Sequence, residues 1–230
     1  MIKVLEELTR TTTSASLSFE ERLAMIVDGE EIHRKNRRYT SKIKAAQMKY
    51  PSACIEDLDY KRRSGLDKGM VLSLAKCEWI NQHQNIILCG PSGIGKGYIA
   101  CALAQRACQE GFSAHYVRVP RLIDNLGLAR ADGSYGKLLE NLSKFDVLIL
   151  DDWGIPLTDG ARRDFLEIME DRYGTRSTVI TTQIPVENWP DVIGDPTQAD
   201  AIMDRLVHNA YEIRMKGPSQ RKLRSTIEKQ

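Results

Sequence analysis

The segment Ile86–Ala100 (IILCGPSGIGKGYIA) constrains the fold of this 230-residue chain more than any other feature. It begins with an apolar run, passes through a glycine-rich loop, and continues into a helix-like stretch. Its glycines and lysine match the pattern G-x-x-x-x-G-K-[ST] at Gly90, Gly95 and Lys96. Such a loop binds phosphate through inward-facing backbone N–H groups and the positive end of the following helix. The segment therefore predicts a strand, a phosphate-binding loop and a helix in succession.

The loop and the start of the helix are the predicted nucleotide contacts. Glycines allow tight curvature and close backbone approach, and Lys96 brings a positive charge to the outer phosphates. The alternative is a glycine turn with a surface lysine, which the flanking strand and helix disfavour. The predicted nucleotide-binding residues are Gly90, Pro91, Ser92, Gly93, Ile94, Gly95, Lys96, Gly97 and Tyr98.

A second apolar run that ends in two acids supplies the other half of the predicted site. Val147–Leu150 is followed directly by Asp151 and Asp152. At the carboxyl end of a buried strand, Asp151 is placed to hold Mg²⁺ directly or through water. Asp152 is placed to face the terminal phosphate and to orient or activate the attacking water. The alternative is a strand that simply ends in two exposed carboxylates.

Gly97 stands where the phosphate-loop pattern requires a hydroxyl side chain. That hydroxyl is a direct Mg²⁺ ligand in such loops, although water is able to replace it because Mg²⁺ keeps several waters. Glycine still offers its backbone N–H to phosphate. We therefore hypothesise that nucleotide binds while Mg²⁺ affinity and hydrolysis are weakened, with turnover lowered by a factor on the order of ten to a thousand.

Short apolar strands alternate with helices after residue 85, which indicates a parallel sheet covered on both faces. The fold class predicted from this alternation is α/β. The expected strands are Ile86–Cys89, Ala114–Val119, Asp146–Leu150, Thr178–Thr182 and Tyr211–Met215. The expected helices between them are Tyr98–Glu110, Arg121–Ala131, Leu138–Lys144, Gly160–Tyr173 and Ala199–His208.

The first 65 residues have a different character and are expected to form a basic helical N-terminal domain. Ser18 and Glu21 have the spacing of a capping box at a helix start, and Pro51 is expected to end the helical region. Leu66–Ile80 is expected to be a further amphipathic stretch, at the start of a second domain that covers residues 66–230.

Seven bases and no acids occupy the interval between Ile32 and Ile55, although the net charge of the chain is only +2. Like charges at helical spacing repel one another, and the phosphates of a DNA duplex would relieve that repulsion. The alternative is a solvated surface helix. We favour sequence-independent contact with double-stranded DNA through Arg34, Lys35, Arg37, Arg38, Lys42 and Lys44.

Composition argues against several other classes of protein. No apolar run approaches the about 20 residues needed to span a bilayer, so we expect no membrane contact. The N-terminal sequence MIKVLEELTR lacks the features of a signal peptide. The five cysteines are scattered without the spacing of metal ligands, which favours reduced thiols in a cytoplasmic protein.

Several further stretches resemble the IstB-like proteins, which are helper ATPases of insertion-sequence transposition and relatives of the replicative helicase loader DnaC. The resemblance extends over nearly the whole chain and is firmest from Leu66 to Arg221. The segments that carry it are Leu128–Lys137, Leu148–Gly154, Asp171–Thr178, Gly194–Pro196, Asp204–His208 and Lys216–Ser219.

This resemblance implies an AAA+ fold with a five-stranded parallel sheet, which makes residues 66–230 an AAA+ ATPase domain. It also implies homo-oligomers, either rings or helical assemblies, with ATP between neighbouring copies. Gln183 matches the position that senses the γ-phosphate, and Arg205 matches an arginine finger supplied to the ATP of a neighbour. Arg221 is a weaker candidate for a further phosphate-sensing arginine.

Together these features predict an ATP-binding AAA+ protein, with DNA-stimulated ATP hydrolysis and Mg²⁺ as cofactor. The protein is expected to assemble on double-stranded DNA and to recruit or activate a partner transposase. One alternative keeps the chemistry and changes the partner, giving a helicase loader related to DnaC. Another is an ATP-dependent scaffold that coats DNA and hydrolyses little ATP, which Gly97 favours.

Overall fold

The computed structural model of the protein describes residues 18–60 and 65–219. The chain divides into two compact units, residues 1–42 and residues 43–230, and each is described by itself below. This division lies upstream of residue 65, so residues 43–60 belong to the unit that contains the sheet. The functional boundary at residue 65 remains a prediction.

The described part of the first unit belongs to a single helix, α2 (Phe19–Ala46). Its start is the predicted capping box, because the Ser18 N–H donates to Glu21 Oε2 at 2.7 Å and the Glu21 N–H donates to Ser18 Oγ at 3.2 Å. The helix ends well before Pro51, where the sequence placed its end. Gln47 has a left-handed backbone with φ of 50°, which stops the helix first.

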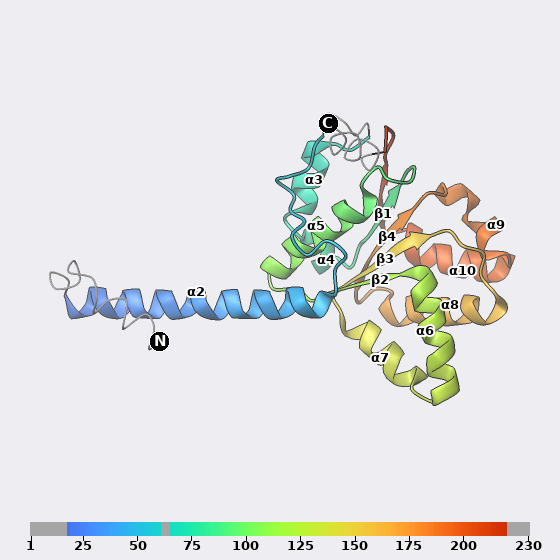
Figure 1. Cartoon of the computed structure of the whole chain (residues 1–230). Coiled ribbons are helices and arrows are strands. Elements are labelled where there is room, and N and C mark those ends of the chain that lie inside the picture. Colours follow the sequence, from blue (N-terminus) through green and yellow to red (C-terminus); the bar gives the residue numbers. More distant parts are fainter. Residues whose placement is uncertain (1–17, 61–64, 220–230) are drawn as a thin grey trace, which may run out of the picture. The chain divides into compact units, whose positions relative to one another are not determined.

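The second unit is built on a sheet of five parallel strands in the order β2-β3-β4-β1-β5 (Figure 1). Apolar residues fill both faces of the central strands, and every residue of β1 and β4 is buried. The strands fall where the apolar runs predicted them, within one residue at either end, except that β3 continues three residues beyond the predicted end at Leu150. Their bounds are β1 (Asn85–Cys89), β2 (Ala114–Arg118), β3 (Val147–Trp153), β4 (Ser177–Thr182) and β5 (Ala210–Arg214).

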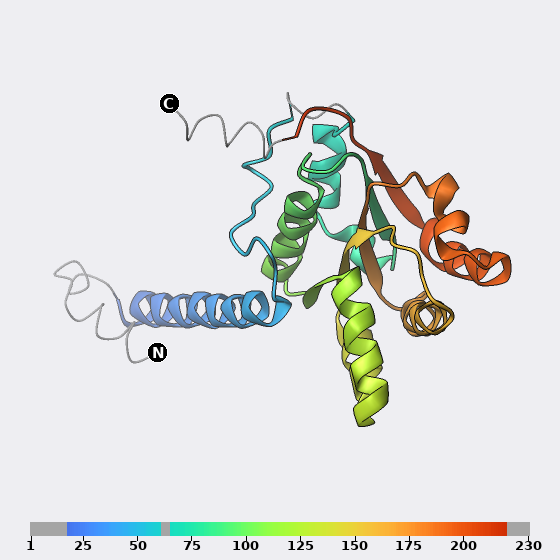
Figure 2. The same cartoon turned by 45° about the vertical axis from the view of Figure 1, so that its right-hand side comes forward.

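Helices cover both faces of the sheet, as Figures 1 and 2 show. On one face lies α5 (Lys96–Gln109), which contacts four of the five strands. The other face carries α6 (Val119–Asp132), α8 (Asp159–Arg172) and α10 (Pro196–Val207), joined by α7 (Tyr135–Lys144), η2 (Val186–Asn188) and α9 (Trp189–Ile193). This arrangement confirms the predicted α/β class with a five-stranded parallel sheet.

The stretch Leu66–Ile80 forms two short helices instead of one continuous one. They are α3 (Lys68–Leu74) and α4 (Glu78–Asn81). Cys77 separates them, because its backbone is left-handed with φ of 62°. Nothing in the residue type marks that position as a break, since left-handed backbone is uncommon for a side chain other than Gly, Asn or Asp.

Aromatic side chains fill the core between the sheet and the helices of the second face. Trp153 stacks on Phe165 with ring centroids 4.5 Å apart and meets the edge of Trp189 at 5.4 Å. Trp153 is therefore a packing residue, although it follows the acid pair directly in the sequence. Among the helices formed by the described residues, none is long and apolar enough to cross a membrane.

Candidate functional site

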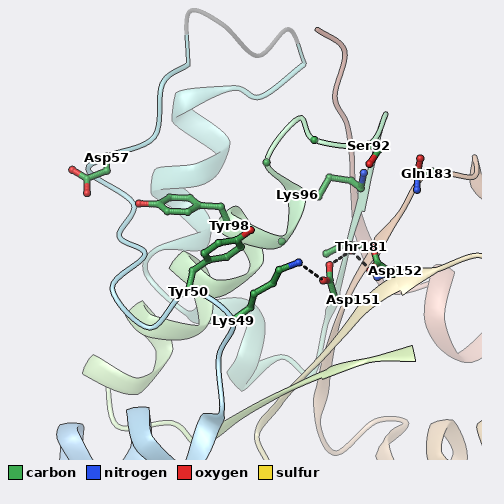
Figure 3. Close-up of a pocket in the computed structure, with 13 residues that line it drawn as sticks. Lys49, Tyr50, Asp57, Ser92, Lys96, Tyr98, Asp151, Asp152, Thr181 and Gln183 are labelled. Atoms are coloured by element: carbon green, nitrogen blue, oxygen red, sulfur yellow. Dashed lines mark hydrogen bonds and ion pairs between the residues drawn. The ribbon is translucent and has the colours of Figure 1, made fainter. Parts of the chain in front are cut away.

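A cavity of about 420 Å³ opens at the carboxyl ends of β1, β3 and β4. Most residues predicted for the nucleotide site line it, and Figure 3 shows their side chains around the opening. The lining residues are Lys49, Tyr50, Asp57, Ser92, Gly93, Gly95, Lys96, Gly97, Tyr98, Asp151, Asp152, Thr181 and Gln183. The structure thus brings the loop, both acids and Gln183 together.

The loop after β1 turns directly into α5. Gly95 is the N-cap of α5 with φ of 107°, a conformation that favours glycine. Lys96 begins the helix, and its ammonium donates to the carbonyl of Gly90 at 2.6 Å and to that of Pro91 at 2.9 Å. Ile94 points into the core and is fully buried. Gly90, Pro91 and Ile94 therefore shape the loop without lining the cavity.

A bulge at the end of β3 turns both acids toward the cavity. The pairing of β3 with β4 shifts register between Leu150 and Trp153, and Asp152 adopts a left-handed φ of 63°. Consecutive side chains of a regular strand point to opposite faces, so the bulge is what lets Asp151 and Asp152 both reach one site. Such a backbone costs on the order of 1–3 kcal/mol and is found at functional sites.

Two hydroxyl groups hold the buried carboxylate of Asp151, which is 3% exposed. Thr181 donates to Oδ1 at 2.6 Å, and Tyr116 donates to Oδ2 at 2.5 Å. Burial and the hydrogen bond to Asp151 raise the pKa of Tyr116, so the phenol stays protonated and remains a donor. The Thr181 hydroxyl also accepts from the Asp152 N–H at 3.2 Å.

Arg118, at the end of β2, pairs with the second acid. Its Nε and one terminal nitrogen lie 3.0 and 2.9 Å from Asp152 Oδ2, and this hydrogen bond raises the pKa of the arginine. Sequence reasoning missed Tyr116 and Arg118. Their spacing of two residues on a predicted strand was a signal that they share one face, but that face meets the acids only because β2 pairs with β3.

The residues around Asp151 fit a cation that arrives with a nucleotide. Among residues 18–60 and 65–219, no group of three or more His, Cys, Asp or Glu side chains is arranged to hold a metal ion alone. Mg²⁺ bound with phosphates needs only one or two protein carboxylates. A Cβ built on Gly97 would lie 3.2 Å from Asp151 Oδ1, so position 97 adjoins that carboxylate, as the loop pattern predicted.

Two tyrosines form another side of the cavity, away from Gln183 in Figure 3. The rings of Tyr50 and Tyr98 are tilted at 51° with centroids 5.8 Å apart. Tyr98 was predicted as a nucleotide contact, whereas Tyr50 and Lys49 were not, because they precede the loop by some forty residues. Flat aromatic surface beside a phosphate loop suits a nucleobase.

Arg205 lies at the opposite ends of the strands. It lines a cavity of about 160 Å³ together with Asn85, Arg176 and Thr178. One of its terminal nitrogens lies 2.5 Å from Glu170 Oε1. Arg205 therefore points away from the nucleotide cavity of its own chain.

The predicted DNA-contacting residues all lie on α2, and two of them are paired with acids one turn earlier. Arg34 Nε is 2.8 Å from Glu30 Oε1, and Lys35 Nζ is 2.6 Å from Glu31 Oε1. The residues in this set are Arg34, Lys35, Arg37, Arg38, Lys42 and Lys44. Arg221 lies outside the described residues.

Known proteins are similar to this chain in sequence over most of their length. Residues 1–227 match the family described as IstB-like ATP binding protein. An insertion sequence ATP-binding protein of Sinorhizobium fredii is 47% identical over 223 residues, covering 96% of this chain and 91% of that protein. The ATP-binding protein of insertion sequence IS1162 from Pseudomonas fluorescens is 48% identical over 186 residues, 80% of each chain.

Solved structures share the fold. DnaI aligns with a TM-score of 0.62 at 24% identity, over 72% of this chain and 92% of that one. The DnaC helicase loader aligns with a TM-score of 0.59 at 20% identity, over 73% of this chain and 98% of that one. At these identities the likeness concerns the fold alone, and it agrees with the predicted AAA+ architecture.

Proposed function

The chain belongs to the family of IstB-like ATP-binding proteins, and from this premise we propose that it is an ATP-dependent assembly factor for insertion-sequence transposition. With ATP bound, copies of the chain assemble on double-stranded DNA and recruit or activate a partner transposase. The observation that carries the proposal is the convergence of the phosphate loop, the acid pair and the polar end of β4 on one cavity.

Each side chain of the cavity has a proposed task in binding and hydrolysis. Lys96 and the loop N–H groups bind the outer phosphates. Asp152 orients the attacking water, and Arg118 fixes the direction of that carboxylate through two short contacts. Mg²⁺, when bound beside Asp151, would offset negative charge on the phosphates. Gln183 lines the cavity where it is able to sense the terminal phosphate.

The proposal is tested by measuring the mass of the full chain with duplex DNA in ATP, in ADP and without nucleotide. We expect discrete oligomers on DNA with ATP and smaller species in the other two conditions. Lys96→Met should remove the ATP-dependent species, while Lys76→Met, an exposed lysine away from the cavity, should retain it. A chain that stays monomeric under every condition would contradict the proposal.

Gly97 favours a second candidate, a scaffold that binds ATP on DNA and turns it over little. The loop supplies no hydroxyl beside Asp151, although a Cβ at position 97 would lie within 3.2 Å of that carboxylate. Multiple-turnover phosphate release, with and without duplex DNA, separates the two functions. Sustained release stimulated by DNA supports the ATPase, and assembly on DNA without release supports the scaffold.

A further inference from the structure

A lysine from outside the phosphate loop enters the cavity and faces its buried acid. Lys49 Nζ lies 3.8 Å from Asp151 Oδ2, and Figure 3 shows the side chain extended toward that carboxylate. Lys49 comes shortly after the end of α2, within the same compact unit as the sheet. Its side chain is 35% exposed, whereas that of Asp151 is 5% exposed.

Each carboxylate oxygen of Asp151 already accepts a hydrogen bond from a hydroxyl group. Thr181 donates to one oxygen at 2.6 Å and Tyr116 donates to the other at 2.5 Å. A buried carboxylate is costly unless it is hydrogen-bonded and paired with a positive charge. The two hydroxyls supply hydrogen bonds but no charge, and Lys49 supplies the charge from the open side of the cavity.

The same open side is where a divalent cation has to approach. Position 97 adjoins Asp151 Oδ1 at 3.2 Å for a built Cβ, but glycine offers no oxygen there. Asp151 is thus the principal protein ligand for a cation carried by the nucleotide, and it faces an ammonium group. The Lys49 ammonium and a divalent metal ion would weaken each other's binding to Asp151, because like charges repel at close range.

We propose that Lys49 is a built-in counter-cation of Asp151 that competes with the divalent cation accompanying the nucleotide. Lys49 has to give up its contact with Asp151 before a metal ion reaches the carboxylate. The lysine therefore sets the metal concentration at which the nucleotide site becomes fully loaded. The inference rests on the proposed nucleotide site and adds a positioning residue that the loop pattern does not contain.

Mn²⁺ provides a direct readout, because free Mn²⁺ is measured by its electron paramagnetic resonance signal independently of hydrolysis. The full chain is saturated with ADP and titrated with Mn²⁺, and nucleotide binding is followed in parallel with a fluorescent analogue. The variants are Lys49→Met, which keeps the aliphatic stem without charge, and Lys49→Arg, which keeps the charge. Lys76→Met is the matched control, since Lys76 is exposed and does not line the cavity.

We expect K49M to lower the half-saturating Mn²⁺ concentration about three- to fivefold, as the loss of one partly exposed ion pair implies. K49R and K76M should stay within about twofold of the wild type, because one keeps the cation and the other never faces Asp151. Equal Mn²⁺ curves for K49M and wild type overturn the inference alone. A higher Mn²⁺ requirement in K49M also overturns it, because Lys49 would then assist loading. Wild-type protein that takes up no nucleotide at any Mn²⁺ concentration overturns the proposed function as well.

Discussion

Gly97 at the end of the phosphate loop lies beside Asp151 of β3. A Cβ at position 97 would lie 3.2 Å from Asp151 Oδ1 and 3.6 Å from Oδ2. The backbone at Gly97 is helical, because the residue lies in the first turn of α5. A side chain is therefore compatible with the local conformation, and a serine hydroxyl would lie beside the carboxylate that faces the cation.

Gly97→Ser is expected to raise Mg²⁺-dependent phosphate release by a factor on the order of ten to a thousand, since it restores one metal ligand. Gly97→Ala is the matched control, because it adds the same tight Cβ contact without the oxygen. Release is measured at saturating ATP over a range of Mg²⁺ concentrations. Equal rates for the serine, alanine and wild-type proteins would contradict the role assigned to this position.

The loop residues and the acid pair could be predicted because each set is continuous in the sequence. Lys96, Asp151 and Asp152 all line the cavity. Tyr116 and Thr181 could not be assigned to Asp151, because their contacts cross between strands and depend on the order β2-β3-β4. A sequence shows that strands exist and are buried, whereas strand order follows from packing of the whole sheet.

At the scale of elements, one helix start could be predicted from the sequence, whereas one helix end and one break between helices could not. The capping box at Ser18 fixes the start of α2 through short-range hydrogen bonds, so it was visible in the sequence. The end of α2 before Gln47 and the break at Cys77 each occur at a residue with a left-handed backbone. Neither residue type predicts that conformation from the sequence. Backbone breaks of this kind are imposed by what the neighbouring segments pack against.

The basic residues of α2 differ in whether an acidic side chain lies one helical turn away. Arg34 and Lys35 each have an acid one turn earlier, at 2.8 and 2.6 Å. Arg37 and Arg38 have no acid three or four positions away in either direction, and both are exposed. Arg37 and Arg38 are therefore expected to contribute more to binding of a DNA phosphate backbone than Arg34 and Lys35.

Arg37→Ala with Arg38→Ala is expected to weaken duplex binding and to lower the slope of log affinity against log salt by about 2, since each phosphate contact contributes about 0.9. Arg34→Ala with Lys35→Ala should lower the slope by less, because those bases are already paired within the helix. Fluorescence anisotropy with a random-sequence duplex at several salt concentrations measures both. Unchanged slopes in both double variants would argue against α2 as the DNA contact.

At the scale of the whole molecule, the nucleotide cavity and the cavity lined by Arg205 lie at opposite ends of the strands of the sheet. Strands of five or six residues separate them, a span of about 17–20 Å. Arg205 is held at its end by Glu170, whereas the phosphate loop is at the other. If Arg205 acts on ATP, it acts on the ATP of a neighbouring copy, and hydrolysis then requires assembly.

A mixing experiment tests this trans arrangement. Arg205→Ala and Asp152→Asn are each expected to abolish hydrolysis in pure form with nucleotide binding and assembly intact, because Asp152 orients the attacking water and does not hold the nucleotide. Mixed in equal amounts on DNA, they should recover up to roughly a quarter of wild-type activity, because random head-to-tail neighbours form one intact site in four. Arg163→Ala, an exposed arginine on α8, serves as control. A mixture as inactive as its components would count against Arg205 in trans.

Equilibrium binding of a fluorescent ATP analogue to the full chain, compared between wild type and Lys96→Met, tests the central claim most directly. The account predicts saturable binding by the wild type and at least about tenfold weaker binding by the variant, because Lys96 supplies a charge-assisted contact to phosphate. Thermal unfolding of both proteins checks that the variant is folded. Absence of saturable binding by the wild type, or equal affinity of the two proteins, would contradict it.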